Sequence, residues 1–386
     1  MCGSTAHTGP RGPMRVRERP IRLVFRIIVF FEETPMTISL RRRVVAAVTG
    51  LALAAGLAAC SNDAEESATS APGSQTSASG SSDSAAFPRT IETQDKDKKP
   101  TEITIEKQPQ RIVSASVSLT GALLALDAPV VGSGGGNPKA PMFADETGFG
   151  LSWDELAKDK GVESLFTIGS ASAEAILAQD PDLVVMSNVG ADTGAEIYDQ
   201  LKDVVPVQVI DYSDQSWEET MNEVAEATGL EDKAEEVISE YEEAVSKAKD
   251  EIKIDGPVNL IALSQEGAVN FFTEESAQGR IFTDLGIELA VPGEDLVGNS
   301  EQGSARSDVK AVNAENVPLA LDGKSVFVLN IDPGTPADQQ VRDNEQLADT
   351  TAVSEDRVYG LDGEFFRIDP IAAKDLVEYL KENFSK

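Results

Sequence analysis

The chain of 386 residues has almost no histidine or cysteine: His7 is its one histidine, and Cys2 and Cys60 are its two cysteines. If the N-terminal leader described below is removed, the mature protein keeps no histidine and a single cysteine, at its first residue. This excludes an internal disulfide, a Cys/His zinc site, a Ser-His-Asp triad, a Cys-His nucleophile pair and a histidine general base. We therefore expect neither enzymatic activity nor a resident metal cofactor.

Basic side chains are also scarce. The chain carries 33 Lys and Arg against 66 Asp and Glu, and nine of the arginines but only three of the glutamates fall in the first 59 residues. The remaining 327 residues therefore have a net charge of −39. Such an acidic surface repels phosphate backbones, so we expect no nucleic-acid partner. At ~100–200 residues per domain, this length predicts two lobes.

The N-terminal region lacks an apolar run long enough to span a bilayer, but it has the parts of a secretory signal. Three arginines at 41–43 precede a short apolar stretch that ends at Cys60. The tetrad Leu-Ala-Ala-Cys at 57–60 is similar to the bacterial lipoprotein box, in which the cysteine is lipidated. Lipidation at Cys60 would anchor the protein to the extracytoplasmic face of the cell membrane; an ordinary signal peptide that ends near a cysteine is the alternative.

A serine-rich segment without aromatic residues follows this signal. Nine of the 26 residues from 61 to 86 are serine. Such a composition buries too little apolar surface to offset the entropy of ordering, so it predicts a flexible tether.

Strand and helix patterns alternate from Arg111 onward. A helical pattern lies between two apolar pairs, at 112–113 and 130–131, and a glycine-rich turn is expected after the second pair. A buried strand is expected at 183–186. This alternation predicts parallel strands covered by helices. The second half repeats the arrangement, because a strand begins about ten residues after Glu315 as it does after Glu174. The repeat predicts two similar lobes.

A long amphipathic helix is expected from Glu231 to Ile252, since this segment has apolar residues at helical spacing and no Gly or Pro. We therefore predict an α/β fold with two Rossmann-like lobes joined by one long helix, and a ligand cleft between the lobes at the carboxyl ends of their strands. The expected divisions are a spurious N-terminal extension at 1–35, a signal peptide at 36–59, a lipid-anchored tether at 60–100, an N-terminal lobe at 101–230, the helix at 231–253 and a C-terminal lobe at 254–386.

Several phrases between 101 and 386 resemble the siderophore- and cobalamin-binding lipoproteins of ABC importers. They lie at 111–130, 172–187, 197–201, 216–219, 273–286 and 364–369. The first and last are typical of the catecholate branch, that of ferric-enterobactin-binding proteins. The resemblance implies the class III solute-binding architecture, binding of a ferric catecholate siderophore, and delivery to the permease and ATPase of an iron importer.

The resemblance also implies the ligand contacts. These are Trp217, Arg306 and Arg367, with Lys139 or Met142 at a third basic position and Arg280 in place of a family glutamine. Guanidinium groups can bind catecholate oxygens and stack on the rings, and indole offers a π-face. Iron arrives already coordinated, so no His or Cys ligand is needed. The alternatives are ion pairs of Arg306 with Asp308 and of Arg367 with Asp369, and packing of Trp217 at a helix start.

Two exposed acids complete the interpretation. Glu174 and Glu315 match acids with which the family docks onto the permease, although carboxylates are favoured at helix starts in any case. Other cargoes remain open: a hydroxamate siderophore, cobalamin, or haem held by Tyr198, Tyr212 or Tyr359. A cell-surface hydrolase or a structural surface protein would be a different class of function.

Overall fold

The computed structural model describes residues 86–264, 268–298 and 307–385, which belong to one compact unit. The expected extension, the signal peptide, Cys60, most of the tether and Arg306 lie outside these residues. In the part of the chain that is described, no helix has both the length and the apolar character needed to cross a bilayer.

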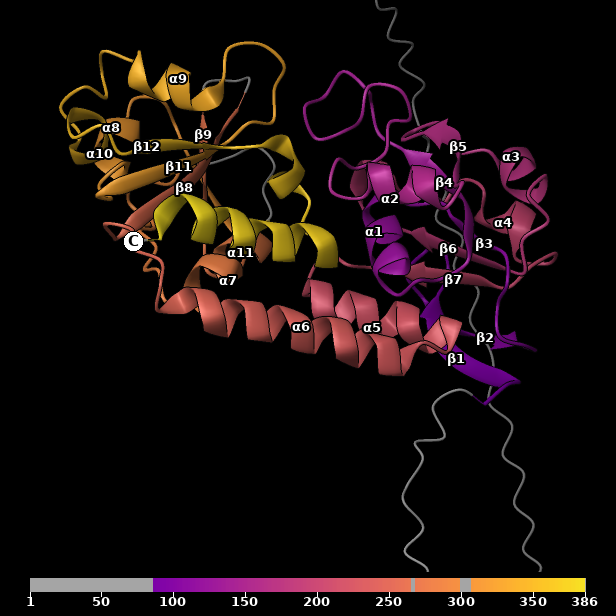
Figure 1. Ribbon diagram of the computed structural model, residues 1–386. Coiled ribbons are helices and arrows are strands. Elements are labelled where there is room, and N and C mark those ends of the chain that lie inside the picture. The colour runs from indigo at the N-terminus through magenta and orange to yellow at the C-terminus, as the bar shows by residue number, and fades with distance from the viewer. Residues whose placement is uncertain (1–85, 265–267, 299–306, 386) are drawn as a thin grey trace, which may run out of the picture. The chain divides into compact units, whose positions relative to one another are not determined.

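The first half of the described chain is built on a parallel five-stranded sheet with the order β5-β4-β3-β6-β7 (Figure 1). Its strands are β3 (Ile112–Ser114), β4 (Val130–Gly135), β5 (Glu163–Thr167), β6 (Leu183–Ser187) and β7 (Val207–Ile210). Its helices are α1 (Val117–Ala125), α2 (Asp154–Asp159), α3 (Ala173–Leu177), η1 (Gly190–Asp192), α4 (Tyr198–Leu201) and α5 (Trp217–Thr228). Strand β6 is the one expected at 183–186; it pairs with β3 and β7, and all of its residues are buried, as is typical of a central parallel strand covered on both faces.

The glycine-rich segment after Val131 is part of strand β4 and not the turn that we expected. A Cβ at Gly132 would lie 2.8 Å from Cδ1 of Leu165, and one at Gly134 would lie 2.7 Å from Cε2 of Phe166. Side chains of the neighbouring strand β5 therefore lie across β4 and occupy the space that a Cβ at either glycine would need. The prediction of a turn was wrong because local composition does not reveal this close approach.

The second half is built on a mixed sheet with the order β10-β9-β8-β11-β12, in which β8, β11 and β12 are parallel and β9 and β10 are antiparallel. Its strands are β8 (Val258–Leu263), β9 (Val269–Phe272), β10 (Val309–Val312), β11 (Ser325–Leu329) and β12 (Val358–Leu361). Its helices are α7 (Ala277–Asp284), α8 (Val317–Ala320), α9 (Ala337–Arg342), α10 (Thr351–Ser354), η2 (Gly363–Phe366) and α11 (Pro370–Phe384). The expected repeat is present as a short helix before a buried strand in each half: α3 before β6, and α8 before β11.

Helix α6 (Glu231–Lys249) connects the two halves. Its buried side chains, Ala234, Tyr241 and Ala248, recur every seven residues and so form one stripe along the helix. Helices α5 of the first half and α11 of the second half both pack against α6. The described chain therefore has the predicted architecture of two α/β lobes joined by a single helix.

An N-terminal hairpin of β1 (Arg89–Gln94) and β2 (Pro100–Ile105) precedes the first lobe. Ile91 is buried in the core, and the hydroxyl of Thr93 lies 2.9 Å from both the backbone N and the carbonyl O of Val209 in β7. The prediction of a flexible tether up to residue 100 was therefore wrong at its C-terminal end. Strand β1 is held in place by contacts with the distant strand β7, which the local composition does not reveal.

Candidate ligand-binding site

Four polar side chains gather where parallel strands end, which is where ligands bind in open α/β sheets. They are Ser118 after β3, Asp192 after β6, Tyr212 after β7 and Arg367 after β12. The first three belong to the first lobe and the last to the second, so the group spans the boundary between the lobes.

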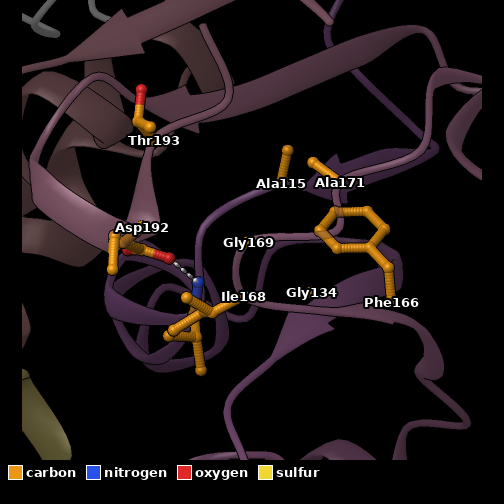
Figure 2. Close-up of a pocket in the computed structure, with 10 residues that line it drawn as sticks. Ala115, Gly134, Phe166, Ile168, Gly169, Ala171, Asp192 and Thr193 are labelled. Carbon is orange, nitrogen blue, oxygen red and sulfur yellow. Dashed lines mark hydrogen bonds between the residues drawn. The ribbon is translucent and has the colours of Figure 1, made fainter. Parts of the chain in front are cut away.

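Asp192 fixes the start of helix α1 (Figure 2). Its carboxylate is almost fully buried, and it accepts hydrogen bonds from the backbone N–H groups of Val117 at 3.1 Å and Ser118 at 3.3 Å, and from the hydroxyl of Ser116. A carboxylate in this position satisfies orphan donors of the helix and is favoured by its dipole. The N-terminus of α1 is therefore occupied by the protein itself.

The small cavity beside Asp192 is lined by Ala115, Gly134 and Phe166 among others (Figure 2). It has a volume of about 10 Å³, which is room for about one water molecule and far too little for a metal chelate. We therefore do not assign the ligand to it.

Tyr212 connects Asp192 to Ser118. Its hydroxyl forms hydrogen bonds with Oδ2 of Asp192 at 3.1 Å and with Oγ of Ser118 at 3.2 Å. The phenol is the donor in both contacts and has a single proton, so it donates to Asp192 or to Ser118 at any one time. Burial, reinforced by the charge of Asp192, raises the pKa of Tyr212 to about 12, so the phenol keeps its proton at neutral pH.

Arg367 reaches across the lobe boundary to this group. Its Nη1 donates a hydrogen bond of 2.6 Å to Oγ of Ser118, and its Cζ lies 5.6 Å from the centre of the Phe143 ring. Its Nε is buried and has no hydrogen-bond acceptor within the described residues. A guanidinium held at one nitrogen and left with a buried unused donor can still bind an anionic oxygen.

The alternative ion pair between Arg367 and Asp369 is not formed. Oδ1 of Asp369 instead accepts from the backbone N–H groups of Ile371 and Ala372 and caps helix α11, and its Oδ2 accepts from the hydroxyl of Ser152 at 3.0 Å. Burial raises the pKa of Asp369 to about 6. This carboxyl is therefore engaged elsewhere, and Arg367 is left to other acceptors.

The loop at 137–142 lies against the turn that carries Arg367. A Cβ at Gly363 would lie 2.5 Å from the carbonyl oxygen of Pro141, so the two segments are in close contact. Of the two residues predicted in this loop, Lys139 is exposed and Met142 packs against the hydrophobic core. The loop thus borders the Arg367 group, and Lys139 is its exposed basic side chain.

Trp217 and Arg280 line one cavity of about 270 Å³ between helices α5, α6 and α7. The ring of Trp217 meets Tyr241 edge-on, with centroids 5.1 Å apart, and the hydroxyl of Tyr241 donates to Asp284 at 3.1 Å. Burial raises the pKa of Tyr241. The wall therefore combines two aromatic rings with a guanidinium, next to the acids Glu218, Glu275 and Asp284.

Trp217 occupies this place because it begins helix α5. Ser216 and Glu219 form a reciprocal capping box, in which the Ser216 hydroxyl accepts from the backbone N–H of Glu219 and the Glu219 carboxylate accepts from that of Ser216. The sequence allowed two roles for Trp217, packing at a helix start or contact with a ligand in a cleft. In the structure Trp217 is buried at the start of α5 and also lines the cavity.

The structure thus places the predicted residues in two groups. Trp217 and Arg280 share the cavity, whereas Arg367 is not part of its lining. The segment 212–217 contributes to both groups, with Tyr212 in one and Trp217 in the other. Sequence reasoning missed Ser118, Asp192 and Tyr241 and considered Tyr212 only as a haem ligand; the position of the first two after predicted strands was the available signal.

The two predicted docking acids lie at helix starts. Glu174 is in the first turn of α3, and Glu315 lies two residues before α8. Both side chains are exposed.

The arrangement described so far, two α/β lobes on one helix with polar groups at the strand ends, agrees with a family match. The family model described as periplasmic binding protein matches residues 112–365. The chain belongs to the periplasmic binding protein family.

Relatives of this periplasmic binding protein cover most of its length. It is 39% identical over 287 residues to the ferric enterobactin-binding periplasmic protein FepB of Escherichia coli O6:H1, which is 73% of this chain and 87% of FepB. It is 26% identical to the iron(3+)-hydroxamate-binding protein FhuD of Bacillus subtilis over 89% of this chain and 98% of FhuD. The structure of holo-ViuP matches with a TM-score of 0.65 and 29% identity, over 78% of this chain and 96% of that one.

Proposed function

We propose that this periplasmic binding protein binds a ferric catecholate siderophore and delivers it to an ABC permease. The similarity to FepB, named for ferric enterobactin, supports the catecholate assignment. A ferric tris-catecholate is a trianion of flat aromatic arms, and the described cation and ring groups match both properties. The role is binding without chemical change, with iron as cargo inside its chelate.

The observation that carries the proposal is the state of Arg367. Its guanidinium is held by Ser118 and lies near Phe143, yet it forms no ion pair with a described residue, and its Nε is buried without an acceptor. In a protein with a formal charge of −33, such a cation is unusual. An incoming anionic chelate would supply the missing acceptors.

The proposal extends to the partners. Exposed Glu174 and Glu315, one on each lobe, would meet basic pockets of the permease, which an ATPase drives. Lipidation of Cys60 would hold the protein on the extracytoplasmic face of the membrane. Arg306 would add a second guanidinium to the ligand contacts.

Ligand titration tests the function. Nanomolar ferric enterobactin should quench the tryptophan fluorescence, and ferrioxamine, a hydroxamate chelate, should not. Replacing Arg306 and Arg367 together by Ala should abolish the quenching, whereas Arg357→Ala, which removes a surface ion pair with Asp255, should leave it unchanged. Preference for ferrioxamine would overturn the catecholate assignment in favour of the hydroxamate class.

A further inference from the structure

The hydrogen-bonded chain from Arg367 through Ser118 and Tyr212 to Asp192 contains three residues with no assigned role in ligand binding. The hydroxyl oxygen of Ser118 is shared, because it lies within donating distance of both Nη1 of Arg367 and the phenol of Tyr212, and the phenol also reaches Asp192. Hydrogen bonds that share a member polarise one another, and this chain ends on the carboxylate of Asp192. The positive charge of Arg367 is thereby linked to a buried negative charge without direct contact between them.

The far end of the chain is rigid. Asp192 is tied to the backbone of Val117 and Ser118 at the start of α1, and Ser118 is the residue that receives Arg367. The phenol of Tyr212 is half-buried and stays protonated, so it cannot turn into a competing anion near the guanidinium. The side chains of Ser118, Asp192 and Tyr212 therefore form a rigid group in the first lobe, here called the frame. This frame holds Arg367 of the second lobe in one orientation.

The frame leaves a defined part of the guanidinium free. Nη1 donates its hydrogen bond to Ser118. The N–H bonds of Nε and Nη2 lie on another edge of the planar guanidinium group and are parallel to each other. Within the described residues Nε has no acceptor. Two neighbouring oxygens, such as those of one catecholate ring, match such an edge in bidentate fashion.

We propose that Tyr212 is a positioning residue that, through Ser118, sets the Nε–Nη2 edge of Arg367 to bind a pair of adjacent anionic oxygens on the ligand. This inference deepens the proposed function and rests on it for the identity of the ligand. Tyr212 itself does not contact the chelate. Removal of the Tyr212 hydroxyl should therefore lower the affinity for the chelate only in a protein that still has Arg367.

Calorimetric titration with ferric enterobactin of the wild type, Tyr212→Phe, Arg367→Ala and the double variant tests the inference. Tyr212→Phe should weaken binding about tenfold, the loss expected when a charge-assisted bond is misaligned. In the Arg367→Ala background the same substitution should have no further effect. Equal losses in both backgrounds would mean direct contact of Tyr212 with the ligand and would overturn the proposal, as would wild-type affinity of Tyr212→Phe.

Tyr198→Phe is the matched control, because this buried tyrosine of the same lobe lies outside the chain and should bind normally. If Tyr212→Phe does not fold, Ser118→Ala interrupts the same chain and should give the same pattern.

A second readout needs no ligand. In a ¹⁵N NMR spectrum the Nε–H of Arg367 should be ordered in the wild type and mobile in Tyr212→Phe; equal order in both would refute the positioning role. If the wild type does not bind ferric enterobactin at all, the proposed function fails, while this measurement still decides whether Tyr212 positions Arg367.

Discussion

The hydroxyl of Ser152 donates a hydrogen bond of 3.0 Å to Oδ2 of Asp369, which lies 217 positions further along the chain. The contact joins the first lobe to the N-terminus of α11 in the second. Helix α1 also approaches this carboxyl, since a Cβ at Gly121 would collide with Oδ2 of Asp369. Asp369 is thus buried between the lobes and is not paired with a cation within the described residues, which makes its ionisation costly.

This burial predicts a pH-dependent stability. The pKa of Asp369 is raised from its ordinary value of 3.8 to about 6, so between these values the folded protein binds more protons than the unfolded chain. Stability contributed by this group therefore falls as the pH rises from about 4 to about 6 and is level above that, with a total change of roughly 3 kcal/mol. Asp369→Asn keeps the helix cap and cannot ionise, so it should remove this part of the pH profile.

Urea unfolding between pH 4 and pH 8 measures the effect as the difference in free energy of unfolding between wild type and Asp369→Asn. The substitution Asp349→Asn at an exposed acid serves as control and should leave the profile unchanged. A wild-type-minus-variant difference that is the same at every pH would contradict the prediction.

The two tryptophans allow the ligand to be located. Trp153 is 2% exposed and packs on Phe149, with ring centroids 4.9 Å apart, whereas Trp217 lines the large cavity. If the ligand reaches that cavity, quenching by ferric enterobactin should come mainly from Trp217. Trp217→Phe should then lose most of the quenching and Trp153→Phe should keep it; the reverse result would place the ligand away from the cavity.

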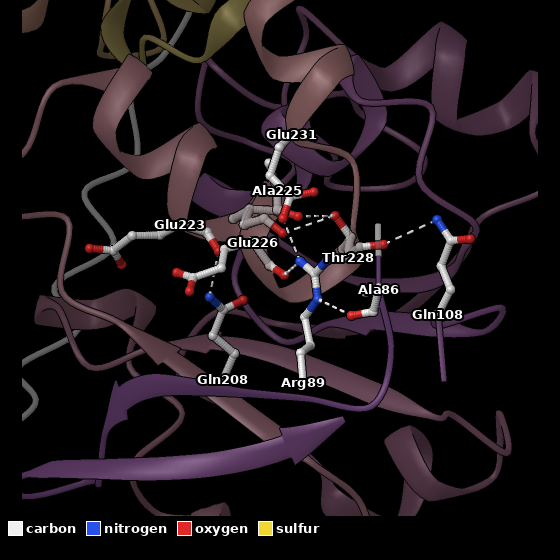
Figure 3. A network of polar contacts seen from close by, with 10 residues as sticks. Ala86, Arg89, Gln108, Gln208, Glu223, Ala225, Glu226, Thr228 and Glu231 are labelled. Atoms are coloured by element: carbon white, nitrogen blue, oxygen red, sulfur yellow. Dashed lines mark hydrogen bonds and ion pairs between the residues drawn. The ribbon is translucent and has the colours of Figure 1, made fainter. Parts of the chain in front are cut away.

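The N-terminal hairpin should depend on Arg89. Its Nη1 donates a hydrogen bond of 2.6 Å to the carbonyl oxygen of Glu226 and pairs with Glu231 at the start of α6, while Oε2 of Glu231 is buried without a hydrogen bond (Figure 3). Arg89→Met would leave this carboxylate without its cation and should cost about 1–3 kcal/mol of unfolding free energy.

Hydrogen exchange checks where that loss acts. In Arg89→Met the amides of β1 and β2 should exchange faster than in the wild type, and adding Glu231→Gln should restore part of the protection, because a neutral amide tolerates the loss of the cation. Lys99→Met, in the exposed turn of the same hairpin, should have little effect. Unchanged exchange in Arg89→Met would show that other contacts hold the hairpin.

Local patterns in the sequence predicted most of the elements but not all of their pairings. The helix from Glu231 and the buried strand at Leu183 are periodic over their own length, so no distant contact is needed to recognise them. The antiparallel β9 and β10, the glycines of β4 and the hairpin beginning at Arg89 depend on neighbours far away in the chain. Those features were missed or misinterpreted for that reason.

The sequence by itself showed that this chain has very few of the histidines and cysteines that most catalytic and metal sites use, and it showed the alternation that makes two α/β lobes on one helix. Only the tertiary structure decided which partners Arg367 has. Its neighbour Asp369 was the obvious choice along the chain, but it caps α11, and Arg367 binds Ser118, 249 positions away. The spacing of residues along the chain predicts local structure. Which acceptor Arg367 binds depends on contacts that form only when the two lobes pack against each other.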